Sequence, residues 1–189
     1  EHHGEEHVAV ASSKLNLGYT LYSQGDLVNA RALSEQALAI WKAKLGDDHP
    51  ELALAYGNIG DFDLDEGQLE DARRNFQRAL ELTAEALGED AADLGYYLTG
   101  LARVALAKGE VDEAIEMSER ALELRAETWL PPGDLGLTQL TLSRALVERD
   151  GKGDRTRARD LALLARGDIE ASGDQRRLAA VQAWLEQMG

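Results

Sequence analysis

The chain has 189 residues, with 44% hydrophobic residues, 35 Asp or Glu, 20 Lys or Arg, and a formal net charge of −15. This hydrophobic fraction excludes a wholly disordered chain, and no apolar run approaches the roughly 18 residues of a membrane-spanning helix. Residues 151–189 hold seven Lys or Arg and six Asp or Glu, which leaves −16 on residues 1–150. Such a surface repels phosphates and anionic lipids, so we expect no nucleic-acid and no membrane partner. The absence of cysteine excludes disulfides and thiolate chemistry and favours a cytoplasmic location.

A pattern of small residues recurs along the chain at intervals of 42, 42 and 44 residues. Each copy has a glycine, an alanine five residues later and a second alanine seven residues after the first, and the glycines are Gly25, Gly67, Gly109 and Gly153. A glycine can end a helix in a left-handed conformation, and an alanine allows two helices to cross closely. The apolar residues between the glycines follow helical periodicity. The pattern therefore predicts four tandem helix pairs.

The predicted repeats occupy about residues 7–46, 47–88, 89–131 and 132–171. In each, a first helix ends at the glycine and a second begins just after it, where Asp26 or Asp154 can cap free backbone N–H groups. Turns between repeats are expected at residues 45–50 and 87–90, and at residues 129–133, where two prolines end the preceding helix. A longer turn at residues 150–153 lies inside the fourth repeat. An amphipathic helix at about 174–188 would cover the apolar end of the array, with Arg176, Gln182 and Glu186 facing solvent.

These residues resemble the tetratricopeptide repeats of the longer, kinesin-light-chain-like variety. Leu17-Gly18, Ile59-Gly60 and Leu101-Ala102 are similar to that family's pair in the first helix, and Asp47-Asp48-His49-Pro50 is similar to its linker. Glu6-His7 resembles the remnant of an earlier linker. The family's aromatic residue in the second helix is present only as Phe76, with Ser34 and Ser118 at the matching positions. The resemblance implies an all-α, right-handed superhelix of four repeats and a capping helix, which forms one domain over residues 1–189.

In this family the first helices line a concave, peptide-binding groove. The resemblance implies that the groove residues are Asn16, Tyr19, Asn58, Asp61, Asp65, Thr99, Arg103 and Arg144. The two asparagine amides can donate to one backbone group of an extended peptide and accept from another. The alternative is that they only bind neighbouring helix ends or water. Asp61 and Asp65 lie one turn apart, which predicts a preference for a peptide with Lys or Arg. The alternative is that the two carboxylates form an ordinary solvated acidic surface.

No pattern in the sequence indicates catalysis, a cofactor or a metal site. His3 and His7 are four residues apart, but at a chain end we expect a frayed segment and not a metal ligand pair. His49 has no serine or cysteine nucleophile near it in the sequence. The three tryptophans, Trp41, Trp129 and Trp184, are expected to pack in or between repeats.

The sequence therefore predicts a non-catalytic module that binds a protein or peptide segment, as a monomer or weak homo-oligomer. The alternative is an oligomerisation or regulatory segment of a multidomain signalling protein. We interpret the chain as a piece of a longer polypeptide. Its C-terminal pattern resembles repeat arrays attached to bacterial signalling proteins, including eukaryotic-like serine/threonine kinases.

Overall fold

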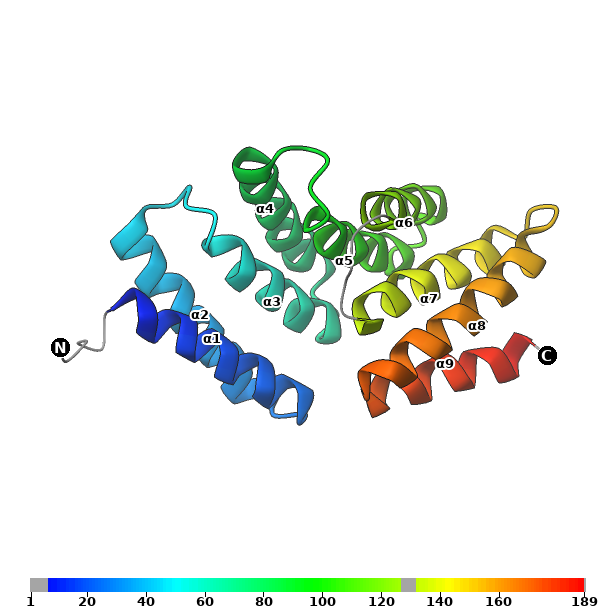
Figure 1. Ribbon diagram of the computed structural model, residues 1–189, viewed down its shortest axis with the longest axis horizontal. Helices are drawn as coiled ribbons and strands as arrows, with labels where there is room; N and C mark the ends of the chain where they lie inside the picture. Colours follow the sequence, from blue (N-terminus) through cyan, green and yellow to red (C-terminus); the bar gives the residue numbers. More distant parts are fainter. Residues whose placement is uncertain (1–6, 127–131, 189) are drawn as a thin grey trace. The chain divides into compact units, whose positions relative to one another are not determined.

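The computed structural model describes residues 7–126 and 132–188 of the chain. Within these residues it contains nine α-helices and no β-strand, which confirms the predicted all-α class (Figure 1). The helices are α1 (Val8–Ser23), α2 (Leu27–Leu45), α3 (Leu52–Asp65), α4 (Leu69–Leu87), α5 (Leu94–Ala107), α6 (Val111–Arg125), α7 (Pro132–Arg149), α8 (Asp154–Ser172) and α9 (Gln175–Met188).

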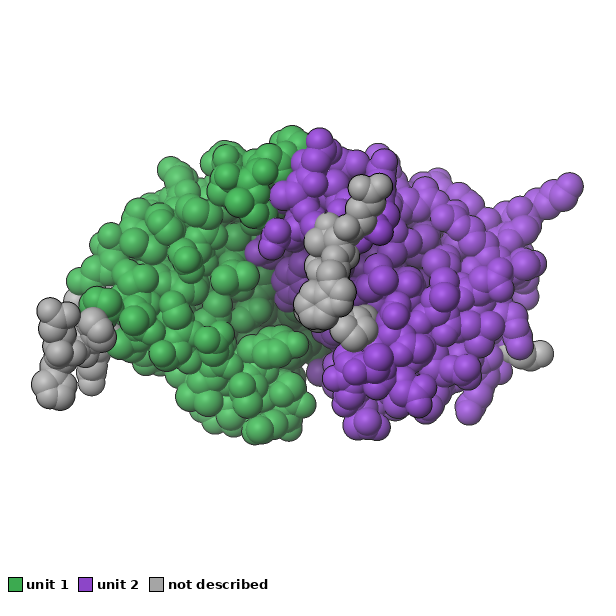
Figure 2. All heavy atoms as spheres, viewed as in Figure 1, with its two compact units in different colours: residues 1–89 green, residues 90–189 purple. Residues whose placement is uncertain are grey.

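The chain divides into two compact units, residues 1–89 and residues 90–189 (Figure 2). In unit 1, α1 packs on α2, α3 packs on α4, and α2 joins the two pairs. In unit 2, α5 packs on α6, α7 packs on α8, α6 joins the two pairs, and α9 packs on α8. Each unit thus contains two of the predicted helix pairs, and the division falls next to the predicted boundary between the second and third repeats. The prediction of one domain over residues 1–189 stays a prediction.

The turn inside each helix pair is built on the predicted glycine. Gly25, Gly67, Gly109 and Gly153 all have positive φ angles, between +76° and +89°. An L side chain rarely adopts this left-handed conformation, which explains why glycine recurs there. After the first glycine, the carboxylate of Asp26 accepts a hydrogen bond from the Asn29 N–H at 3.3 Å, as predicted for a helix cap.

The prediction that Asp154 caps the last helix pair in the same way is wrong. The N-cap of α8 is Gly153, and Asp154 is the first helical residue. Its carboxylate accepts from the Gly151 N–H at 2.9 Å and from Nε and Nη2 of Arg149 at 2.7 and 2.8 Å. The longer turn at residues 150–153 is the physical reason, because it places the end of α7 within reach of this carboxylate.

The repeated alanines lie at the crossings of paired helices. All eight are fully buried: Ala30, Ala37, Ala72, Ala79, Ala114, Ala121, Ala158 and Ala165. The first helix of a pair also carries a small residue at the crossing. A Cβ on Gly18 would lie 3.1 Å from the Ala30 carbonyl oxygen, and one on Gly60 would lie 3.0 Å from the Phe76 ring. Ser34, Phe76 and Ser118 are all fully buried at matching positions of the second helices. Close packing at these crossings explains the spacing of small residues.

The segments before the first helices of unit 1 also match one another. Nδ1 of His7 accepts from the Ala9 N–H at 3.1 Å, and Nδ1 of His49 accepts from the Glu51 N–H at 3.2 Å. His7 is therefore the N-cap of α1. The equivalence of these two segments, 42 residues apart, agrees with the linker resemblance. His3 lies outside the described residues.

The last helix covers one end of unit 2. Val181 of α9 is fully buried, whereas Arg176, Gln182 and Glu186 are exposed, as predicted for a capping helix. Trp184 is partly buried beside α7, and Trp41 is buried in α2, so both pack as expected. Trp129 and most of the proline-containing turn lie outside the described residues, and Pro132 is the first residue of α7.

Candidate peptide-binding surface

All eight predicted groove residues lie on the first helix of a pair, which we call the A helix. The A helices are α1 and α3 in unit 1 and α5 and α7 in unit 2. Tyr19, Asp61, Arg103 and Arg144 occupy one repeated position, because each follows the small residue of its A helix, which is Gly18, Gly60, Ala102 or Ser143. The repeat thus has one position on each A helix at which the residue type differs from helix to helix.

In unit 1, two asparagine side chains lie at equivalent positions of α1 and α3. Asn16 is exposed and Asn58 is partly buried. Within the described residues, neither side-chain amide makes a hydrogen bond. The alternative that they bind neighbouring helix ends therefore finds no support in these residues. Tyr19, one turn after Asn16, is 56% exposed and adds an aromatic side chain to the same face.

The two acidic residues of α3 have different surroundings. Asp65 is exposed, and its Oδ2 accepts a hydrogen bond from the Tyr22 hydroxyl at 2.9 Å. Asp61 is only 7% exposed. The Tyr22 ring also lies 5.2 Å from the Phe62 ring, so α1 and α3 meet through this tyrosine. Of the expected acidic pair, Asp65 offers the more accessible negative charge.

Leu54 extends this face of α3, and the sequence reasoning did not include it. It precedes Asn58 by four residues and is 53% exposed. Positions 54, 58, 61 and 65 follow helical spacing on one side of α3. The sequence shows the four-residue spacing between Leu54 and Asn58, but only the structure shows that Leu54 is exposed. It gives the surface an apolar contact beside its amides and carboxylate.

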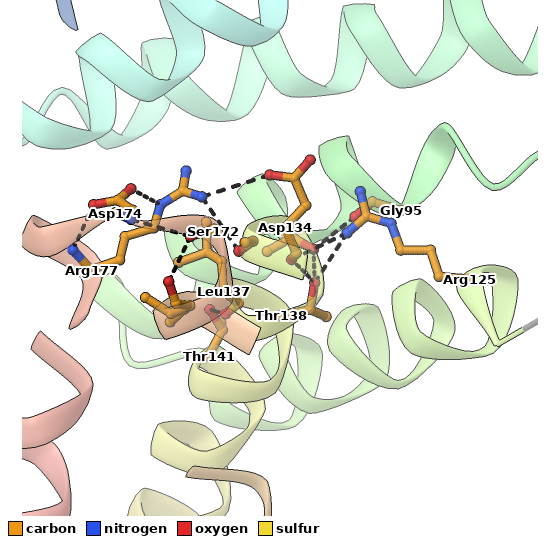
Figure 3. A network of polar contacts seen from close by, with 12 residues as sticks. Gly95, Arg125, Asp134, Leu137, Thr138, Thr141, Ser172, Asp174 and Arg177 are labelled. Atoms are coloured by element: carbon orange, nitrogen blue, oxygen red, sulfur yellow. Dashed lines mark hydrogen bonds and ion pairs between the residues drawn. The ribbon is translucent and has the colours of Figure 1, made fainter. Parts of the chain in front are cut away.

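In unit 2, Thr99 is buried in a polar network at the junction of α5, α6 and α7. Thr99 is 2% exposed, and its hydroxyl donates to the Gly95 carbonyl oxygen and pairs with the Thr138 hydroxyl, both at 2.7 Å. Nη1 of Arg125 donates to the Thr138 Oγ1 at 3.3 Å and to the Asp134 carbonyl oxygen at 3.4 Å (Figure 3). Thr99 thus holds neighbouring helices together and presents little surface to a partner in this structure.

Arg125 is the buried cation of this network. Burial lowers its pKa, and the negative charges of Asp134 and Asp93 oppose that effect. The Arg125 side chain also fills the space beside Gly95, where a Cβ would meet its Nε at 2.3 Å. On the other side of the network, Nη1 of Arg177 lies 3.6 Å from Oδ1 of Asp134, which connects α9 to α7 (Figure 3). These contacts hold α5 and α7, the A helices of unit 2, against α6 and α9.

The remaining candidates of unit 2 are two partly buried arginines on neighbouring A helices. Arg103 lies on α5 and Arg144 lies on α7, and the two helices pack against each other. The Arg144 guanidinium lies over the Trp184 ring, with Cζ 5.7 Å from the ring centroid. Burial lowers the pKa of Arg144, and the positive charge of Arg103 lowers it further. Two positive charges therefore lie on neighbouring A helices of unit 2.

A hollow of about 850 Å³ lies away from these residues, along α6. Its wall carries acidic side chains, but its arginines are already ion-paired within the chain. Arg120 contacts Asp90 and Glu123, each at 2.8 Å, and Arg149 contacts Asp154 at 2.7 Å. Arg78 and Asp48 of unit 1 form the ion pair equivalent to Arg120 and Asp90. The arginines of this hollow are therefore engaged within the chain.

Family models identify the chain. Two models, each described as tetratricopeptide repeat, match residues 10–51 and residues 51–127, which together exceed half of the sequence. The chain belongs to the tetratricopeptide repeat family. Members of this family are generally non-catalytic modules for protein–protein interaction. No curated protein matches the chain in sequence.

Solved structures of the same fold confirm the kinesin-light-chain-like resemblance. The chain is similar to kinesin light chain nearly identical TPR-like repeats from Podosopora anserina, with 20% identity, a TM-score of 0.67 and coverage of 96% of both chains. It is also similar to BtubC (BKLC) from P. vanneervenii, with 21% identity and a TM-score of 0.64, covering 93% of this chain and 64% of that one. The apo form of RapI matches with 15% identity and a TM-score of 0.63, with 94% and 64% coverage. At these identities the likeness shows the fold alone.

No helix of the described residues has both the length and the apolar composition needed to cross a bilayer.

Proposed function

We propose that the chain is an interaction module without catalysis of its own, which binds a peptide or protein segment along its A-helix surfaces. One observation carries this proposal: Asn16 and Asn58 repeat at equivalent positions, and their amides make no hydrogen bond within the described residues. A side-chain amide can donate and accept at once, which suits the backbone of an extended segment. Tyr19 and Leu54 supply exposed aromatic and apolar contacts beside them.

The helix pairs support this function because they hold the binding side chains in place before a partner arrives. The A helices of unit 1 are joined by the Tyr22–Asp65 hydrogen bond, and those of unit 2 by the Thr99–Thr138 contact. A preformed surface reduces the ordering cost of association. A cytoplasmic setting is part of the proposal.

For unit 1 we propose a partner segment that brings a lysine or arginine to Asp65. The carboxylate of Asp65 is exposed at the A-helix surface, where it accepts a hydrogen bond from the Tyr22 hydroxyl. An attraction between exposed charges weakens as salt rises, since the Debye length falls from about 10 Å at 0.1 M to about 3 Å at 1 M. Affinity that is independent of ionic strength would speak against this preference.

The test uses peptides selected by the intact chain from a random displayed library. Synthetic copies of the selected peptides are titrated by fluorescence anisotropy against the wild type and a double variant, Asn16→Ala with Asn58→Ala. A neutral hydrogen bond contributes about 1 kcal/mol, so losing both amides is expected to weaken binding about tenfold or more. The matched control is Gln77→Ala with Gln182→Ala, which removes two exposed amides outside the A helices. Equal affinities of the wild type and the asparagine variant would remove the proposal.

The alternative function is an oligomerisation or regulatory segment of a multidomain signalling protein. Leu163 and Leu164 of α8 are 41% and 58% exposed, and they give self-association a physical basis. Light scattering over a range of concentrations distinguishes the two functions. A constant monomer mass would leave only the interaction module.

A further inference from the structure

Within the part of the chain that the structure describes, Arg144 has no ion-pair partner, although the chain is rich in carboxylates. Asp and Glu outnumber Lys and Arg by 35 to 20, and many arginines have an acidic partner. Those with an ion pair include Arg31, Arg78, Arg120, Arg149, Arg155 and Arg157. Among the described residues, Arg144 makes neither a hydrogen bond nor an ion pair. The N–H groups of its guanidinium can therefore donate hydrogen bonds to an acceptor on a bound partner.

Packing holds the Arg144 guanidinium in one place. Its Cζ lies 5.7 Å from the centroid of the Trp184 ring, an arrangement typical of a cation–π contact. The Trp184 Nε1–H donates to Ser143 Oγ at 2.8 Å, and this hydroxyl donates to the Ala158 carbonyl oxygen at 2.7 Å. The ring is therefore anchored to α7 and α8. A fixed planar guanidinium loses less entropy when it forms a bidentate bond.

The positive charge of Arg103 acts on the Arg144 guanidinium. Arg103 occupies the equivalent position of α5, the A helix that packs on α7, and its charge lowers the pKa of Arg144 beyond the effect of burial. Two like charges held on neighbouring helices repel each other, and an anion bound beside them relieves that repulsion. Carboxylates match the planar fork of arginine by accepting two parallel N–H bonds.

We propose that Arg144, supported on Trp184 and assisted by Arg103, binds the side-chain carboxylate of an Asp or Glu in the partner segment. This inference rests on the proposed function and specifies the chemistry of the partner at unit 2. The A-helix surfaces of the two units thus differ in charge preference, with an acidic side chain favoured at Arg144 of unit 2 and a basic one at Asp65 of unit 1.

The probes are the library-selected peptides, synthesised with amidated C-termini so that only side-chain carboxylates are present. Each has a twin in which every Asp and Glu is replaced by Asn or Gln. We expect the twins to bind the wild type about tenfold more weakly or worse, since hydrogen bonds to charged groups are worth about 1.5–3 kcal/mol. Arg144→Gln is expected to bind a peptide and its twin with equal affinity, and Arg144→Lys to recover only part of the difference.

The matched control is Arg159→Gln, which removes an exposed arginine from α8, outside the A helices. It is expected to retain the full difference between each peptide and its twin. Circular dichroism checks that each variant is folded, and Arg144→Met, which keeps a long unbranched side chain without the charge, replaces Arg144→Gln if the latter fails this check. With Arg144→Met, a peptide and its twin are expected to bind with equal affinity.

Three results would overturn the inference. Equal binding of peptides and twins to the wild type, with binding that still depends on Asn16 and Asn58, would remove it and leave the proposed function intact. Failure of the chain to select any peptide would remove both this inference and the proposed function. An Arg159→Gln effect as large as that of Arg144→Gln would show general charge attraction and would also contradict the assigned site.

Discussion

Arg31 of α2 and Asp63 of α3 form an ion pair that joins the two helix pairs of unit 1, with Nη2 and Oδ1 2.8 Å apart. The Asp63 side chain is 3% exposed, and its Oδ2 accepts a second hydrogen bond from Asn75 Nδ2 at 2.7 Å. Burial lowers the pKa of Arg31, but Asp63 and the neighbouring carboxylates raise it to a greater extent overall. Asp63 therefore connects three helices through one carboxylate.

Replacing Asp63 with Ala should destabilise the protein by about 3 kcal/mol, because it leaves the partly buried Arg31 without its closest partner. Urea unfolding followed by circular dichroism measures the change. The control is Asp48→Ala, which removes the carboxylate that pairs with Arg78 but is 83% exposed. We expect that change to cost less than about 1 kcal/mol. Equal costs for the two variants would show that burial does not decide the strength of these pairs.

Replacing Gly60 with Ala should also destabilise the protein, although alanine favours a helix. The new Cβ would lie 3.0–3.1 Å from three atoms of the Phe76 ring, which is fully buried and has little room to move. Overpacking of this kind costs about 1–3 kcal/mol, which exceeds the gain of up to about 1 kcal/mol in helix propensity.

The control for Gly60 is Gly167→Ala in α8. Gly167 is an exposed helical residue, and a Cβ there would meet no atom within 4 Å. We expect a gain of about 0.5–1 kcal/mol in the free energy of unfolding. A stabilised Gly60→Ala variant would mean that Phe76 can move and that the crossing is loosely packed.

Asp154 should make the stability of unit 2 depend on pH. The hydrogen bond from Arg149 holds the pKa of this carboxyl below its ordinary value, and the Gly151 N–H acts in the same direction. The folded state therefore favours the charged form. Its stabilising contribution is present above the ordinary pKa of an aspartate, about 4, and is lost as pH falls through the lower folded pKa.

The measurement compares thermal unfolding of the wild type and Asp154→Asn at pH 7, 5 and 3. The variant should be less stable at pH 7, and the difference should shrink toward pH 3. Asp160→Asn, an exposed change in the same helix, should show no such convergence. A difference that stays constant with pH for Asp154→Asn would contradict the role assigned to this carboxylate.

Much of the fold was predictable because its signals are local. Gly25 and its three equivalents mark turns, since the left-handed backbone conformation excludes most other residues. Ala30 and its equivalents mark helix crossings, because a larger side chain would collide with the facing helix. The turn before α8 was predicted less well. There Asp154 accepts from Arg149 and from the Gly151 N–H and does not cap α8, because the length of the turn brings these donors within its reach.

The candidate surface was only partly predictable. Asn16, Tyr19 and Asp65 are exposed on the A helices, but Asp61 and Thr99 are buried. Repeat spacing gives the helix face on which a residue lies. It does not show whether a neighbouring helix covers that face, since this depends on residues far away in the sequence. The same reason explains why the exposed Leu54 was missed.

The sequence by itself determined the number of helix pairs and the position of the turn inside each pair, because backbone conformation and side-chain size act within a few residues or at a fixed period. Only the tertiary structure decided which charges stay available to a partner. Arg144 is held by Trp184, which lies 40 residues further along the chain on α9, and Thr138 engages Thr99 from the next helix pair. Such contacts depend on how helices pack in three dimensions, and no local pattern encodes them.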